Sequence, residues 1–526
     1  MAWTQLTSMT THLATTTHPS ATAPRGRWLW VLAILSVVLL LAPLVYLGVR
    51  AFGVPVTEMA EIITQSRALE YGLNTIALGL GAAVITLVAG VAIAVGISRA
   101  RTSWQRPLLV LSSLPLAIPS YLASYGWLVL LPGLEGYWPS LLLLSAVTIP
   151  YVVLPTAARL RSIGAAQEMV ARTLGRSPLR AFLETTWPLI RGTSLAGTLL
   201  VFLYAVSDFG LVAMLRFHTL TWGVNAAYSA SFNRNQAAVL ALLLVVLAIV
   251  AVTSERAVRG ASTGVYTRGS YGSPEMGRSG TLILLTLAVV PLLTGVLIPL
   301  VGMLTRLIEA QTVADTNWPR LVAATGSTIG VALAAAVVAT LLALPIAALA
   351  ARFRSRAARV IESLGYLSHA LPGVVVGLSL VFLSLRLIPA IYQTTIVLVF
   401  AYAVLFASKS IGTSRAAIES VPHTVVMVAR TLGQSPWGAW RKVTLPLALP
   451  SIAVGALLVM VSTMKELPAT LILRPTGVNT LATELWTKTV ALEFGAAAPY
   501  AALLVVIAAI PAMFLGGMRS ERGEAR

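Results

Sequence analysis

Long apolar stretches that carry no charge are the feature that most limits the folds open to this sequence. Eleven are clear, at residues 28–49, 71–98, 107–134, 136–158, 235–254, 279–305, 321–351, 363–385, 387–408, 443–464 and 494–518. A twelfth, 192–207, stops at Asp208 and continues apolar from Phe209 to Leu215. A helix of roughly 20 apolar residues crosses a bilayer core about 30 Å thick and satisfies its own backbone hydrogen bonds there. The sequence therefore predicts an all-α membrane protein with twelve transmembrane helices.

The composition agrees with this class and excludes others. Hydrophobic residues make up 57% of the chain and charged residues 10%, whereas soluble proteins carry about 25% charged residues. The chain has no cysteine, which excludes disulfides, thiolate metal sites and a cysteine nucleophile. No metal site is predicted, because the five histidines show no spacing typical of ligands; they are His12, His18, His218, His369 and His423.

The net charge of +19 is unevenly distributed along the chain. If successive loops lie on alternate sides of the membrane, the side of the N-terminus carries 27 Lys and Arg and 8 acidic residues, and the other side carries 10 of each. Lys and Arg concentrate in cytoplasmic loops. We therefore expect both termini in the cytoplasm, and we attribute the high pI to topology and contact with anionic lipid rather than to nucleic acid.

An internal repeat divides the chain into two halves. Residues 170–175, Val-Ala-Arg-Thr-Leu-Gly, recur at 428–433. Six spans in each half make the repeat parallel, with a pseudo-twofold axis along the membrane normal. Other matched pairs are Thr75 with Thr328, Arg99 with Arg352, Pro119 with Pro372, Thr186 with Thr444, and Asp208 with Glu466. The expected divisions are a disordered cytoplasmic tail at 1–27, a first half at 28–254, a flexible cytoplasmic linker at 255–280, a second half at 281–518 and a second tail at 519–526.

The repeated segment is a cytoplasmic loop, about 159–191 in the first half and 412–446 in the second. Each copy reads as helix, turn, helix: a glycine ends the first helix in a left-handed conformation, a serine caps the second, and a proline takes its first position. A later proline closes this second helix or opens the next span. These loops are longer than the 2–8 residues that usually connect bundle helices, so docking to a twofold partner is favoured over simple connection. The expected docking residues are Ala171, Arg172, Gly175, Ser177, Pro178 and Pro188, and their counterparts Ala429, Arg430, Gly433, Ser435, Pro436 and Pro446.

These loops resemble the "EAA" loops of the membrane subunits of ABC importers. The glycine and the proline thirteen residues later fit that pattern, whereas Met169 and Met427 replace its Glu. Glu168 lies one residue away in the first copy, and the second copy has no nearby acid. The resemblance implies a type I importer permease, two six-helix repeats fused in one chain of the bacterial inner membrane. It also implies two copies of an ATPase on the cytoplasmic side and a periplasmic or surface-tethered substrate-binding protein outside.

Among fused permeases the chain looks most like the ferric-iron permeases of the Fbp/Sfu type. The segments that carry this resemblance are 207–210, 464–471 and 481–486. Related permeases for thiamine and for phosphonates share much of it, so these cargoes stay open as alternatives.

The chain itself is expected to be non-catalytic and to hold no cofactor. A phosphate-binding loop needs a lysine directly after a glycine, and none of the four lysines follows one; they are Lys409, Lys442, Lys465 and Lys488. ATP and Mg²⁺ would therefore bind to the separate ATPase.

Three charged residues stand at the predicted outer ends of the fifth spans: Asp208 in the first half, and Lys465 and Glu466 in the second. They either sit at the water interface or pair across the pseudo-twofold axis, or they line the substrate pathway, where carboxylates suit a hard cation. Pro115, Pro119 and Pro372 interrupt the third span of each half.

A gradient-driven transporter of the major-facilitator kind is the competing class, because it also has twelve spans in two parallel halves. Such carriers have a short loop with Gly, Asp and Arg between spans two and three. Residues 99–106 contain neither Gly nor Asp, which favours the importer permease.

Overall fold

The computed structural model describes residues 27–524 except 101, 165, 230–232, 261–277, 354 and 369–370. The expected N-terminal tail, except Arg27, and most of the expected linker lie outside the described residues. The described part is built from helices.

The first half contains α1 (Arg27–Phe52), α2 (Val56–Thr64), α3 (Ser66–Arg99), α4 (Thr102–Ser113), the 3₁₀ helix η2 (Leu114–Ala117), α5 (Ser120–Leu130), α6 (Tyr137–Thr148), α7 (Pro150–Ile163), α8 (Ala166–Thr173), α9 (Pro178–Ala181), the π-helix η3 (Phe182–Thr186), α10 (Trp187–Ser207), α11 (Gly210–Met214), α12 (Leu220–Ser229) and α13 (Arg234–Gly260).

The second half contains α14 (Arg278–Leu292), the π-helix η4 (Leu293–Leu297), α15 (Ile298–Leu307), α16 (Ala310–Asp315), α17 (Trp318–Arg352), α18 (Arg356–Leu367), α19 (Gly373–Leu387), the 3₁₀ helix η6 (Pro389–Ile391), α20 (Thr395–Glu419), α21 (His423–Thr431), α22 (Pro436–Ala439), the π-helix η7 (Trp440–Thr444), α23 (Leu445–Met464), α24 (Pro468–Leu473), α25 (Leu481–Val490) and α26 (Phe494–Glu524).

The described residues include nine helices long and apolar enough to cross a membrane, and a tenth if one bent pair is counted as a single span. Two further apolar helices, Gly373–Leu387 and Phe494–Ala509, are shorter. Every one of the twelve expected stretches falls on one of these segments, but the count of twelve full spans is not reproduced. The bent pair is the expected third span, which turns by 85° between Ala117 and Ser120 because Pro115 and Pro119 interrupt it.

The fifth span differs from the prediction at both of its ends. It begins at Pro178, not at 192, and runs unbroken for 30 residues to Ser207. The apolar residues after Asp208 do not extend it but form the separate helix α11. In the second half the matching span starts at Pro436 and ends at Met464. The second helix of each predicted hairpin is therefore the first turn of a span.

Three π-helices allow prolines to stand inside long helices. A proline removes the hydrogen bond to the residue four before it and clashes with that carbonyl. Pro188, Pro299 and Pro446 each follow a π-helix by two residues, so the carbonyl that would clash lies in the widened turn. Pro188 and Pro446 thus stand near the start of α10 and α23 but ten residues inside the continuous fifth spans, so they do not open those spans as predicted.

The first span of each half packs against the other half. Helix α1 lies mainly against α17, α18 and α19, and the segment from α14 to α15 lies against α3, α5 and α6. At the contact of α15 with α5, a Cβ on Gly302 would overlap the carbonyl of Gly126, so the two backbones touch there. This exchange ties the halves together across their interface.

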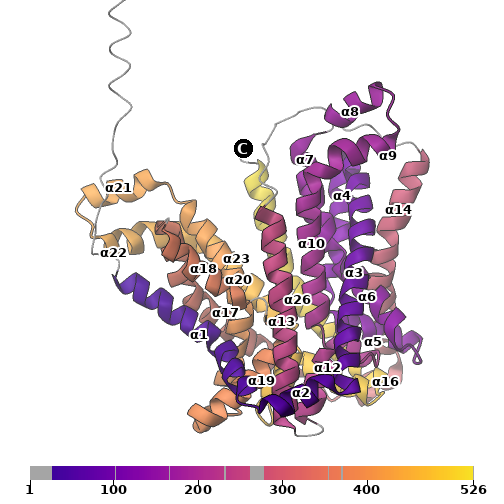
Figure 1. Ribbon diagram of the computed structural model, residues 1–526, viewed down its shortest axis with the longest axis vertical. Helices are drawn as coiled ribbons and strands as arrows, with labels where there is room; N and C mark the ends of the chain where they lie inside the picture. The colour runs from indigo at the N-terminus through magenta and orange to yellow at the C-terminus, as the bar shows by residue number, and fades with distance from the viewer. Residues whose placement is uncertain are drawn as a thin grey trace, which may run out of the picture.

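Two lobes are visible in Figure 1, one formed by α3, α7, α10 and α14, the other by α17, α20, α23 and α1. They diverge toward the end that carries α8, α9, α21 and α22, which we call the hairpin end. The start of α1 and the C-terminus also lie toward this end, as expected of an even number of spans. Helices α2 and α16 lie at the opposite end.

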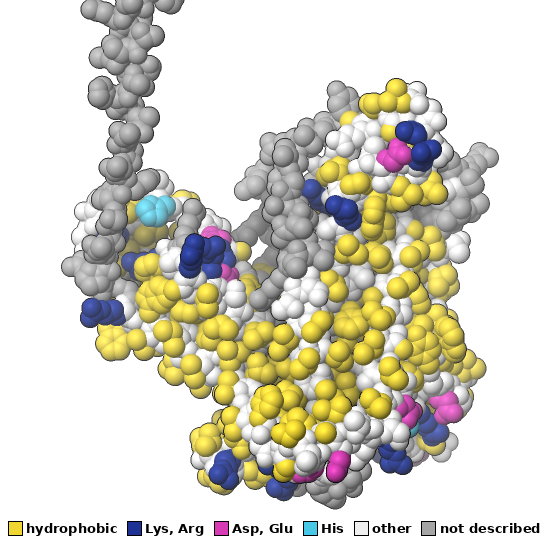
Figure 2. Space-filling view, viewed as in Figure 1, with side chains coloured by type: hydrophobic (Ala, Val, Ile, Leu, Met, Phe, Trp, Pro, Cys, Tyr) yellow, Lys and Arg dark blue, Asp and Glu magenta, His cyan; other side chains and the backbone are white. Residues whose placement is uncertain are grey.

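Apolar side chains cover the outside of the lobes between the two ends, and charged side chains gather near the ends (Figure 2). Helix α3 presents an exposed apolar stripe, and α17 presents the same stripe 253 residues later: Leu69, Leu80, Val84 and Val88, and Val322, Leu333, Val337 and Leu341. Apolar exposure on this scale suits a lipid environment and not water.

Candidate functional site

The first hairpin has the backbone geometry that the sequence predicts. Gly175 ends α8 with φ +83°. Its N–H donates to the carbonyl of Arg172, and the N–H of Arg176 donates to that of Ala171, both at 3.1 Å. This is the paired arrangement in which a left-handed glycine closes a helix. Ser177 then caps α9 by accepting from the N–H of Arg180 at 3.4 Å, and Pro178 takes the first helical position.

The second hairpin repeats these contacts. Gly433 has φ +86° and donates to the carbonyl of Arg430, and Gln434 donates to that of Ala429, again at 3.1 Å. Ser435 accepts from the N–H of Gly438 at 3.0 Å, and Pro436 follows. A Cβ added to either glycine would meet nothing within 4 Å. The surrounding space at these turns is therefore free, and only the backbone conformation requires glycine.

Both hairpins expose apolar side chains at matching positions. Leu174 and Leu432 are 78% and 77% exposed, and Leu179 is matched by Trp437, which is 69% exposed. Val170 and Val428 are exposed beside them. Ala429 is buried and Ala171 half-buried beneath this surface, whereas Arg172 and Arg430 point outward. The hairpin end thus offers two similar apolar surfaces with a basic residue beside each.

Glu168 holds the first hairpin against the spans. Its side chain is 4% exposed and accepts from the Arg99 guanidinium at 2.5 Å and from the Thr186 hydroxyl at 2.8 Å. Arg99 ends α3, and Thr186 ends η3. The sequence matched Arg99 with Arg352 and showed Glu168 one residue from the expected loop acid, but it did not predict that Arg99 and Glu168 pair.

The second hairpin lacks this ion pair. Arg352 and Thr444 stand at the positions that match Arg99 and Thr186, but Val426 stands where Glu168 does in the first half. No acidic partner for Arg352 is present among the described residues, and its guanidinium lies over the ring of Phe353 instead. Among the described residues, the buried ion pair therefore fastens the first hairpin but has no equivalent at the second.

Asp208 and Glu466 are buried, each 8% exposed, and each caps the short helix that follows a fifth span. Asp208 accepts from the N–H of Leu211 at 3.0 Å and from the Ser120 hydroxyl at 2.5 Å. Glu466 accepts from the N–H groups of Ala469 and Thr470 at 3.0 and 3.1 Å. The two carboxylates are buried and, among the described residues, do not pair with each other, so the expected pairing across the axis is not seen between them. Their role in the substrate pathway stays a prediction.

The two carboxylate sites differ in the length of the acid and in the size of the residue that faces it. Ser120 and Gly373 each follow the proline that breaks a third span. Ser120 donates to the shorter Asp208, whereas a Cβ on Gly373 would overlap the carboxylate of Glu466. The longer acid occupies the space that a side chain would fill. Lys465 is half-buried and donates to the carbonyl of Leu116 in the first half at 3.3 Å, so it joins the halves at this level.

The paired threonines of the repeat play one structural role. The hydroxyl of Thr75 on α3 accepts from the N–H of Leu220 at 2.9 Å, and that of Thr328 on α17 accepts from the N–H of Leu481 at 2.9 Å. Both contacts fix the start of a helix, α12 or α25, on the second span of its half.

Comparison with known proteins identifies the family. Residues 86–258 and 343–517 each match the family described as binding-protein-dependent transport system inner membrane component. The chain belongs to this family. Each match runs from the second span of a half to its last, so one domain of the family is present twice. The hairpins and the buried carboxylates both lie inside these matches.

Three relatives are similar to this permease over different shares of its length. The Fe(3+)-transport system permease protein FbpB 2 of Haemophilus influenzae is 29% identical over 503 residues, which are 93% of this chain and 97% of that protein. The molybdenum transport system permease protein ModB of Mycobacterium bovis is 29% identical over 256 residues, 45% of this chain and 94% of that protein. The sulfate transport system permease protein CysW of Escherichia coli is 26% identical over 207 residues, 36% of this chain and 71% of that protein.

The residues of this permease that the structure describes contain no group of three or more histidines and carboxylates able to hold a metal ion. Asp208 and Glu466 in particular are engaged by helix N–H groups.

Proposed function

We propose that this permease carries ferric iron across the bacterial inner membrane as part of an ATP-driven importer. Two copies of a separate ATPase, which binds ATP and Mg²⁺, would dock on the hairpins in the cytoplasm. A periplasmic or surface-tethered binding protein would deliver the iron to the opposite face. The observation that carries this proposal is the end-to-end similarity to a ferric-iron permease, because it covers both halves and 97% of that protein.

The hairpin geometry supports the docking step. Two similar apolar surfaces, one from each half, lie at one end of the molecule and suit two identical ATPase subunits. Each surface belongs to a rigid turn closed by two hydrogen bonds, and each turn continues directly into a fifth span. A force applied at a hairpin would therefore pass along that span to the break at Asp208 or Glu466.

The lobes supply the moving parts. They are farther apart at the hairpin end than at the opposite end (Figure 1). We propose that ATP binding draws the hairpins together, closes this end and opens the opposite one, and that hydrolysis resets the lobes. Because the first spans are exchanged between halves, the lobes would turn as linked bodies.

The other cargo that a specific observation favours is an oxyanion. Relatives named for molybdenum and sulfate match 45% and 36% of this chain. Thiamine and phosphonates remain alternatives from the sequence resemblance. A gradient-driven carrier is disfavoured, because both halves match a family whose transport depends on a binding protein.

The test is uptake of radiolabelled ferric iron into vesicles that contain this permease, its candidate ATPase and its binding protein. We expect ATP-dependent uptake that Gly175→Asp and Gly433→Asp each abolish. Gly477→Asp is the matched control, because Gly477 also has a positive φ, +86°, with nothing within 4 Å of an added Cβ, but lies in the turn between α24 and α25, away from the hairpins. Coupled ATPase activity without iron uptake would mean that the importer carries a cargo other than iron. Uptake that ignores ATP and both hairpin changes would refute the importer.

A further inference from the structure

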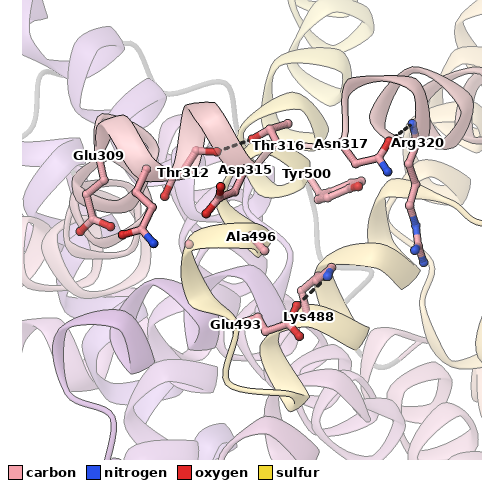
Figure 3. Close-up of a pocket in the computed structure, with 12 residues that line it drawn as sticks. Glu309, Thr312, Asp315, Thr316, Asn317, Arg320, Lys488, Glu493, Ala496 and Tyr500 are labelled. Atoms are coloured by element: carbon pink, nitrogen blue, oxygen red, sulfur yellow. Dashed lines mark hydrogen bonds and ion pairs between the residues drawn. The ribbon is translucent and has the colours of Figure 1, made fainter.

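A polar cavity of about 490 Å³ opens at the end of the molecule opposite the hairpins. It lies between α16, the start of α17, the end of α25 and the start of α26 (Figure 3). Its volume falls within the roughly 300–1,000 Å³ range of small-ligand sites. Five charged residues line it, namely Glu309, Asp315, Arg320, Lys488 and Glu493.

Most charges around the cavity are already paired. Lys488 contacts Glu493 at 2.6 Å, and Arg320 contacts the buried Glu484 at 2.8 Å. Glu309 contacts Arg306 at 2.9 Å. Asp315 is exposed and has no ion-pair partner among the described residues. It also stands at the last residue of α16, where the helix dipole disfavours a negative charge.

The side chain of Thr312 also lines the cavity. Thr312 is 7% exposed, and its carbonyl accepts from the Thr316 hydroxyl at 2.6 Å. Its own hydroxyl takes part in no hydrogen bond with the part of the chain that is described. The cavity therefore offers one unneutralised carboxylate and an unused hydroxyl to an occupant.

The corresponding region of the first half is built differently. Helix α2 follows the first span and packs on α13, just as α16 packs on α26. There, Asn235 donates to Glu58 and accepts from Arg50, both at 2.8 Å. Val54, Ile62 and Val239 form a small apolar core beneath them. The pseudo-twofold symmetry of the permease is therefore broken at this end, with the cavity on the second half.

We infer that this cavity receives a lysine or arginine side chain of the substrate-binding protein and so fixes which way round that protein docks. The inference rests on the proposed function. A single binding protein has no twofold axis, so on a pseudo-symmetric platform it needs one feature that the two halves do not share. The free carboxylate selects a cationic group. A bare metal ion is disfavoured, because no three ligands gather among the described residues.

The test uses the complete importer in vesicles and measures ATPase activity against the concentration of binding protein. We expect Asp315→Lys to raise the concentration that gives half-maximal stimulation by about tenfold, with the basal activity unchanged, because an attraction becomes a like-charge repulsion. Ala496→Trp, which fills the cavity without changing its charge, should act in the same direction. Glu61→Lys is the matched control, an exposed acid on α2 in the first half, and should leave the curve unchanged.

Three results would refute the docking inference. The inference fails if both cavity variants give the wild-type curve, or if Glu61→Lys shifts it as far as Asp315→Lys does. It also fails if the cavity variants leave the binding-protein curve unchanged but alter the response to free cargo, because the occupant would then be a small molecule. Wild-type permease that no binding protein stimulates would refute the proposed function instead.

Discussion

Neutralising Glu168 should loosen the first hairpin without unfolding the permease. Removing one partner of a buried ion pair costs about 3–5 kcal/mol. Arg99 keeps 20% of its side chain exposed and would regain some hydration. We therefore expect Glu168→Gln to lower the free energy of detaching α8 by about 2–3 kcal/mol. Since about 1.36 kcal/mol is a factor of ten, α8 should detach about 30- to 150-fold more often.

Hydrogen exchange of the purified permease in lipid nanodiscs measures this opening. The amides of 166–173 should exchange faster in Glu168→Gln by that factor, and those of 423–431 should not change. Glu184→Gln is the matched control on the same hairpin: Glu184 pairs with Arg180 at 2.9 Å and with Arg176 at 3.4 Å, but it is 43% exposed. Surface pairs of this kind contribute about 0–1 kcal/mol to stability, so Glu184→Gln should speed exchange of the 166–173 amides by less than about fivefold.

The wild-type protein offers a second check, because its second hairpin has Val426 in place of the acid. We expect α21 to exchange faster than α8 before any substitution is made. If Glu168→Gln changes exchange in α8 no more than Glu184→Gln does, the ion pair is not what fastens the hairpin, and the reasoning is refuted.

Three further predictions concern glycines. Gly302→Leu should prevent stable folding, because its Cβ would overlap the carbonyl of Gly126; loss of the monodisperse peak in size-exclusion chromatography would register this, and a normal peak would contradict the exchanged packing. Gly433→Val should reduce the folding free energy by about 1–2 kcal/mol, because valine disfavours the left-handed backbone at this position. It should also lower ATP-stimulated transport while the protein still inserts. Full transport would contradict a rigid coupling turn. Gly373→Ala should lower the midpoint temperature of thermal unfolding by displacing Glu466, and adding Glu466→Asp should restore part of that loss. If the shorter acid restores none of it, the glycine at 373 is not there to make room for the longer acid.

The sequence alone determined the class of fold and the form of the hairpins. Span positions follow from apolar length, because a bilayer imposes one thickness on every helix. The turn at Gly175 follows from local rules, because a left-handed residue, a serine cap and an N1 proline act within a few residues of each other. The repeat then placed the second hairpin by identity alone.

Only the tertiary structure decided which groups meet across the chain. Apolar helices resemble one another on every face, so nothing in the sequence shows that α1 packs on the other half. Arg99 and Glu168 are 69 residues apart and pair because α8 folds back onto the end of α3. The fifth spans were predicted to begin too late because charged residues interrupt the apolar run, Glu184 and Arg191 in the first half and Arg441 and Lys442 in the second, whereas the helix continues through them. The cavity beside Asp315 depends on how α16 and α26 pack, and packing that differs between two similar halves is set by tertiary contacts.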